Sequence, residues 1–143
     1  MKVKSAFMVI MFLSCGAHAT GCETVEEMDT ADAAASKIHD WAGANSFYSH
    51  FRQCDDGYIS EGISATVTKL LAHEWGTLDR LEKITNKDNN FKLWVLNHID
   101  TTADGGDLEL IIHNAGEKCT EDSKNLCEKI GNAANQALQE LKE

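Results

Sequence analysis

The chain has 143 residues, with 23 acidic and 13 basic residues that give a formal net charge of −10, five cysteines and no proline. This length suits one domain of ordinary size. The acidic balance argues against binding to nucleic acid or to anionic membrane surfaces, since both attract lysine and arginine, but it allows a basic protein partner.

Residues 1–19 have the pattern of a secretory signal peptide. Two lysines precede a short apolar segment, 6–13, and small residues at Ala17 and Ala19 provide a cleavage site. Cleavage after Ala19 predicts a mature helical domain of residues 20–143. We expect this domain to have no membrane span, because no later segment is apolar over a sufficient length.

Processing as a lipoprotein at Cys15 is the alternative for the same segment. Ser14 suits the position before a lipidated cysteine, but Phe12 stands where leucine is usual. We therefore expect an exported protein without a lipid anchor. Loss of the leader would leave 11 basic against 23 acidic residues, a net charge of −12.

Four cysteines remain after cleavage, and an even number in an exported protein predicts two disulfides rather than free thiols or a metal site. Four cysteines allow three pairings. Cys119 and Cys127 are close in sequence and suit a small closed loop, which leaves Cys22 to pair with Cys54. Each bridge would stabilise so small a domain by restricting the unfolded chain.

Apolar residues recur at helical spacing along the mature chain, and no stretch alternates strictly between apolar and polar residues as a half-buried strand would. A first helix is predicted over 31–51, preceded by a polar tail, with Gly43 as a kink or break. A second helix is predicted over 57–75, with Asp55 or Asp56 as its N-cap. Helix capping thereby explains the aspartates in "CDDGYIS".

The second half of the chain predicts four further helices. A short one covers 78–84, and Asp88 caps a segment so apolar that we place it at the centre of the fold. Asp104 and Asp107, three residues apart, form a capping-box-like pair before the next helix, and an amphipathic helix covers 126–141. About six helices joined by short polar turns predict one compact all-α domain.

Several motifs that resemble metal or catalytic sites are incomplete. The stretches 52–63 and 100–111 resemble calcium loops, but isoleucine stands where the bidentate carboxylate must be. The sequence "HEWGT" lacks the second histidine of a zinc protease helix. We therefore predict no enzyme activity, no metal and no cofactor. The helical histidines are interpreted as surface or hydrogen-bonded side chains: His39, His73, His98 and His113.

Features between Cys54 and Leu141 occur in an order that is typical of one protein family. A cysteine and "DGYI" open a helix, "EWGTLDRL" and "FKLWVLNHIDTTADGGDLELI" follow, and a close cysteine pair precedes the last helix. This order resembles the periplasmic immunity proteins that neutralise amidase effectors of type VI secretion systems. The resemblance covers about two thirds of the precursor. It implies an all-helical periplasmic protein, often a homodimer, that blocks the active cleft of a peptidoglycan-cleaving amidase.

The surface that would bind this cognate amidase is predicted from the chain's own residues, not from the family. We expect it in the turn before the helix that contains Leu108, because the turn is polar, acidic and rich in small residues. A protruding acidic loop of this kind could enter a cleft that holds cysteine and histidine, although the simpler interpretation is a plain helix connection. The candidate residues are Asp100, Thr101, Thr102, Asp104, Gly105, Gly106 and Asp107.

A second class of function fits the same composition: a small periplasmic stress or chaperone-like protein, or a ligand-binding helical protein. Stress chaperones of this size usually expose apolar surface on acidification, so pH-dependent opening would favour them. A neighbouring gene for a cysteine–histidine amidase would favour the immunity function.

Overall fold

The computed structural model describes residues 21–143, and all regular structure within this range is helical. The predicted signal peptide, 1–19, and the lipidation alternative at Cys15 lie outside the described residues. The helices in chain order are α1 (Val25–Ala35), α2 (Trp41–Phe51), η1 (Arg52–Cys54), α3 (Gly57–His73), η2 (Trp75–Thr77), α4 (Leu78–Thr85), α5 (Asn89–Asn97), α6 (Gly105–Glu117) and α7 (Lys124–Glu140), where η marks a 3-10 helix.

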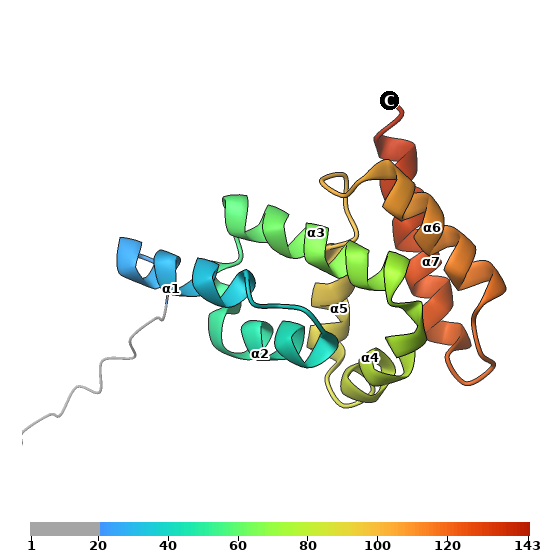
Figure 1. Cartoon of the computed structure of the whole chain (residues 1–143), viewed down its shortest axis with the longest axis horizontal. Helices are drawn as coiled ribbons and strands as arrows, with labels where there is room; N and C mark the ends of the chain where they lie inside the picture. The colour runs from blue at the N-terminus through green and yellow to red at the C-terminus, as the bar shows by residue number, and fades with distance from the viewer. Residues whose placement is uncertain (1–20) are drawn as a thin grey trace, which may run out of the picture.

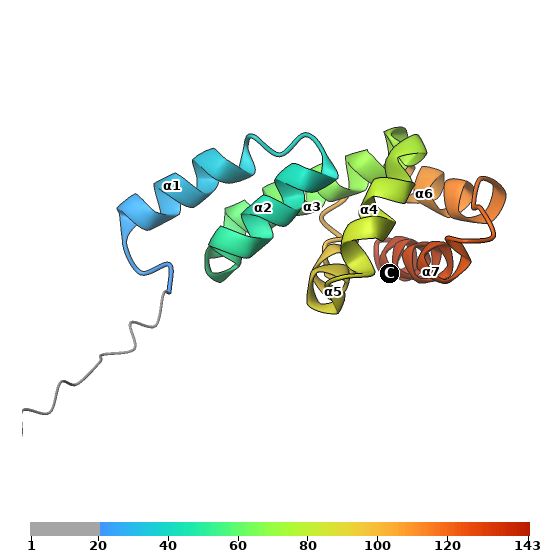
Figure 2. The same ribbon diagram turned by 90° about the horizontal axis from the view of Figure 1, so that it is seen from below.

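Helix α3 lies in the middle of the molecule, with α1 and α2 at one end and the closely packed pair α6 and α7 at the other (Figures 1 and 2). The apolar faces of the helices meet in one core, as the helical spacing predicts. Within the described part of the chain, no helix is long and apolar enough to cross a membrane. The largest apolar side chains with almost no exposure are Phe91, Ile59, Ile63, Leu71, Leu81, Leu108, Ile111 and Ile130.

The predicted starts of α3 and α5 are confirmed. Asp56 caps α3 by accepting a hydrogen bond from the backbone N–H of Gly57 (2.8 Å), and Asp88 caps α5 in the same way through Phe91 N–H (3.0 Å). Gly57 has a φ of +52°, which residues with a Cβ adopt only under strain. The "DDG" sequence therefore provides the N-cap, Asp56, and a glycine that adopts the positive φ at the first residue of α3.

The first predicted helix is wrong in its bounds. The segment 31–51 contains two helices, because the chain leaves α1 after Ala35 and restarts at Trp41, where the Asp40 carboxylate caps α2 through Gly43 N–H (2.7 Å). Gly43 is thus inside α2 and not a break. The preceding residues, predicted as a polar tail, form most of α1, so residues 21–143 contain seven α-helices where about six were predicted.

Both predicted disulfides are confirmed. Cys22 is bonded to Cys54, and Cys119 is bonded to Cys127. The first bridge ties the residues before α1 to the end of η1, and the second joins the residues after α6 to α7. Two disulfides in a helical domain of this size fit an oxidising compartment outside the cytoplasm.

The two disulfides are expected to contribute unequally to stability, because they close loops of different length. They span 32 and 8 residues, for which chain entropy gives about 4 and about 2.5 kcal/mol. Alanine replacement of Cys22 and Cys54 should therefore lower the free energy of unfolding more than replacement of Cys119 and Cys127. Urea unfolding of the two double variants measures this difference, and an equal or reversed order would contradict it.

Candidate functional site

The turn between α5 and α6, residues 98–104, extends from the body of the protein beside the start of α6 (Figure 1). Its tip, Thr101 and Thr102, is exposed, whereas Ile99 and Ala103 on either side are buried. Oδ1 of Asp100 accepts hydrogen bonds from the backbone N–H (2.8 Å) and the hydroxyl (2.6 Å) of Thr102. The tip is therefore closed by local hydrogen bonds and fixed at both bases by buried apolar side chains.

A chain of hydrogen-bonded side chains continues from the turn into the core. Three of its residues are buried and two, Asp55 and Asp100, are partly exposed. We call these five residues the buried network: Asp55, Ser64, Trp94, His98 and Asp100. Ser64 Oγ on α3 donates to Asp100 Oδ2 (2.8 Å) and lies 2.9 Å from His98 Nδ1. Asp55 Oδ2 lies 2.9 Å from His98 Nε2 and accepts a hydrogen bond from Trp94 Nε1 (2.6 Å). The network thus joins the entry to α3, the middle of α3, α5 and the turn.

Both ring nitrogens of His98 have a partner in the network. A serine hydroxyl has one proton, and Ser64 donates it to Asp100, so the oxygen of Ser64 faces His98 Nδ1 at 2.9 Å. On the other side of the ring, the carboxylate of Asp55 lies 2.9 Å from Nε2. The buried His98 ring is therefore joined directly to Asp55 and, through Ser64, to Asp100.

Both carboxyl groups of the network are held in the ionised form. Burial alone would raise the pKa of Asp55, but the hydrogen bond and positive charge of His98, together with the Trp94 N–H, outweigh burial and lower it. Burial likewise opposes ionisation of Asp100, but the side-chain and backbone donors of Thr102 outweigh it and lower its pKa. Protonation of either group would weaken the hydrogen bonds that hold the network together.

We expect the protein to lose stability in acid through these two carboxylates. Because the folded-state pKa values of Asp55 and Asp100 lie below their unfolded values, their contribution is complete above the ordinary carboxyl pKa of about 3.9 and is lost as the pH falls through the lowered values. Urea unfolding between neutral and acidic pH should show this decline. Asp55→Asn should flatten it, and an unchanged pH dependence would contradict the assignment.

The arrangement of Ser64, His98 and Asp55 resembles a catalytic serine–histidine–aspartate triad, but its surroundings do not suit catalysis. Ser64 is 1 % exposed and His98 is 4 % exposed, so neither lies where a substrate could reach it. The hydroxyl proton of Ser64 is also directed to Asp100 rather than to the imidazole. A nucleophile must meet its substrate and give its proton to the base. We therefore assign a structural role to the network, which is to hold the turn in place.

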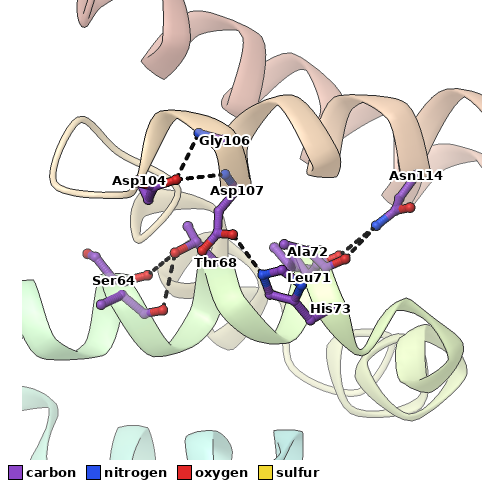
Figure 3. A network of polar contacts seen from close by, with 10 residues as sticks. Ser64, Thr68, Leu71, Ala72, His73, Asp104, Gly106, Asp107 and Asn114 are labelled. Atoms are coloured by element: carbon purple, nitrogen blue, oxygen red, sulfur yellow. Dashed lines mark hydrogen bonds and ion pairs between the residues drawn. The ribbon is translucent and has the colours of Figure 1, made fainter.

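Helix α6 holds the turn from its other side (Figure 3). Asp104 caps α6 by accepting from Gly106 N–H (2.9 Å) and Asp107 N–H (3.2 Å). The predicted capping box is therefore only half formed. The Asp104 side chain accepts from Asp107 N–H, but Asp107 Oδ1 contacts His73 Nε2 on α3 (2.7 Å) instead of the backbone N–H of Asp104. Two turns further along α6, the fully buried Asn114 donates to carbonyl groups at the end of α3.

The seven predicted site residues form one continuous segment with two distinct roles. The carboxylates of Asp100, Asp104 and Asp107 are occupied by hydrogen bonds within the domain. Gly105 lies partly buried, while Thr101, Thr102, Asp104 and Gly106 are exposed. The surface that a partner could contact is therefore formed by threonine side chains, glycine backbone and Asp104, with Asp100 and Asp107 as its support.

A shallow hollow of about 300 Å³ adjoins the base of the turn. It is lined by the end of α5, by Asp100 and by one face of α7, and could take a side chain of a partner.

Among the described residues, no group of three or more His, Cys, Asp or Glu side chains is placed to hold a metal ion. Comparison of the chain with protein-family models, with curated proteins and with solved structures gives no match.

Proposed function

We propose that this chain is an immunity protein that binds and inhibits a peptidoglycan-cleaving amidase effector of a type VI secretion system. The observation that carries the proposal is the exposed tip of the α5–α6 turn, supported from one side by the buried network and from the other by α6. The sequence resemblance over 54–141 supplies the class of partner. The periplasm is the proposed location, in keeping with the two disulfides.

A turn held in this way suits tight inhibition. A flexible loop loses conformational entropy when it binds, whereas a loop already fixed in its bound form avoids most of that cost. An immunity protein needs high affinity, because any free hydrolase continues to cut the cell wall. A nanomolar dissociation constant corresponds to about −12 kcal/mol, which an interface of standard size can reach when a few groups are well buried.

The test is an inhibition assay with a purified cysteine–histidine amidase effector, taken from the neighbouring gene where that gene encodes one. Peptidoglycan hydrolysis should fall to background at one equivalent of the protein, with a dissociation constant in the nanomolar range. The protein alone should release no product from peptidoglycan. Undiminished hydrolysis in the presence of excess protein would contradict the proposal. Analytical ultracentrifugation of the free protein tests the homodimer that the resemblance implies.

The buried network also favours a second candidate function, a periplasmic chaperone that opens in acid. Protonation of the two carboxylates would weaken the hydrogen bonds that join Asp55 to His98 and Asp100 to Ser64, and local opening would expose apolar surface. The measurement is the aggregation of an acid-denatured client protein with and without this chain. Suppression that appears only at acidic pH would favour the chaperone, and no suppression would exclude it.

A further inference from the structure

Helix α1 is fixed firmly to the domain although it adds little to the core. Ala31 is its one buried residue. The disulfide Cys22–Cys54 holds the residues before it, and a capping box between Thr24 and Glu27 closes its N-terminus (3.1 and 3.0 Å). An isolated helix of this length is marginal in water. The fold therefore holds in place a helix that is mostly exposed.

One face of α1 borders a groove that ends at Phe51 on α2. The groove has a volume of about 820 Å³, and its apolar lining comes from Val25, Ala33, Ala34 and Phe51. Val25 is 74 % exposed, and Phe51 is only partly covered. The groove lies at the end of the molecule opposite α6 and α7, far from the tip of the α5–α6 turn (Figures 1 and 2).

The rim of this groove is acidic. Glu26 and Asp29 line it directly, and Lys37 is its one lining cation. Glu23, Glu27 and Asp32 add charge nearby and are exposed, so that 23–32 holds five acids and no lysine or arginine. Charge of this sign repels anionic surfaces and attracts lysine and arginine. An apolar strip inside an acidic rim is complementary to an apolar side chain flanked by cations.

We propose that the groove along α1 is a docking site for a basic segment of a partner protein. One aliphatic or aromatic side chain of that segment lies between Ala33 and Phe51, and flanking lysines or arginines meet Glu26 and Asp29. Because α1 is fixed by the disulfide and the capping box, the groove is formed before the partner arrives. The site is separate from the α5–α6 turn and does not depend on the amidase proposal.

The test uses a short lysine-rich peptide with one central tryptophan, titrated into the ¹⁵N-labelled protein. Saturable shift changes are expected along α1 and at Phe51, and they should weaken as salt is added. Ala33→Arg should weaken binding at least tenfold, because it fills the groove and brings a like charge while keeping a good helix former. Ala42→Arg, on the exposed surface of α2, is the matched control and should leave binding unchanged.

Val25→Ser provides a second variant that removes apolar contact without changing charge, and it should also weaken binding several-fold. A peptide with glutamate in place of lysine should not bind. The absence of saturable binding, equal weakening by the two arginine variants, or shift changes centred outside α1 and Phe51 would each overturn the proposal. Amide spectra of both α1 variants should retain the helical shifts of α1, which separates loss of docking from loss of the helix.

Discussion

Asp55→Ala is expected to lower the free energy of unfolding by about 2–6 kcal/mol, because two buried groups lose their hydrogen-bond acceptor at a cost of about 1–3 kcal/mol each. The Asp55 carboxylate accepts hydrogen bonds from both Trp94 and His98. Without it, the buried His98 ring and the indole N–H of Trp94 lose their partner. Urea unfolding at neutral pH, monitored by circular dichroism, measures the change.

Asp56→Ala is the matched control for this experiment. Asp56 adjoins Asp55 in sequence but is exposed, and its side chain only caps α3. Its replacement should cost about 1 kcal/mol, the usual value for an N-cap. Similar losses in the two variants would show that the buried network contributes no more than a cap, which would contradict its assignment as the support of the turn.

Thr101→Arg is expected to weaken binding of the cognate amidase at least about 30-fold, equivalent to the 2 kcal/mol that defines an interface hot spot. Thr101 is exposed at the tip, and none of the hydrogen bonds that close the turn involves its side chain. A long cation there would keep the tip out of a close-fitting cleft while the domain stays folded. Isothermal titration calorimetry gives the affinity, and thermal unfolding should be unchanged.

Thr120→Arg is the control for the tip variant, because Thr120 is also exposed and lies in the connection between α6 and α7. It should leave the affinity unchanged. Asp104→Ala, by contrast, should mainly cost stability, about 1 kcal/mol, since Asp104 caps α6. Full affinity in Thr101→Arg would remove the tip from the interface and direct attention to the turn before α5.

Local signals in the sequence were enough to predict most helices and both disulfides. The caps of α3 and α5 follow from aspartates placed just before apolar periodic segments. Helix α1 could not be found in this way, because "VEEMDTADAAA" has hardly any apolar periodicity. It is stabilised instead by a capping box and a disulfide to a distant residue, and Thr24 with Glu27 is the signal that could have indicated it.

The hydrogen bonds that hold the candidate turn could not be predicted from the sequence. Composition indicated the segment 100–107, because polar and small residues there separate two apolar segments. The directions of the carboxylates depend on contacts between residues far apart in the sequence. Asp55 and His98 are 43 residues apart, and His73 and Asp107 are 34 residues apart. Trp94 on α5 and His98 at its C-cap, four residues apart, were the available hint of a polar network.

Hydrogen–deuterium exchange of the protein with and without the amidase tests the central claim most directly. If the supported turn is the inhibitory surface, bound amidase should slow exchange at the backbone amides of 100–107 more than elsewhere in the domain. The free protein should already exchange slowly at Thr102 and Ala103, whose amides are hydrogen-bonded to Asp100. Tight binding with no added protection in 100–107 would contradict the account.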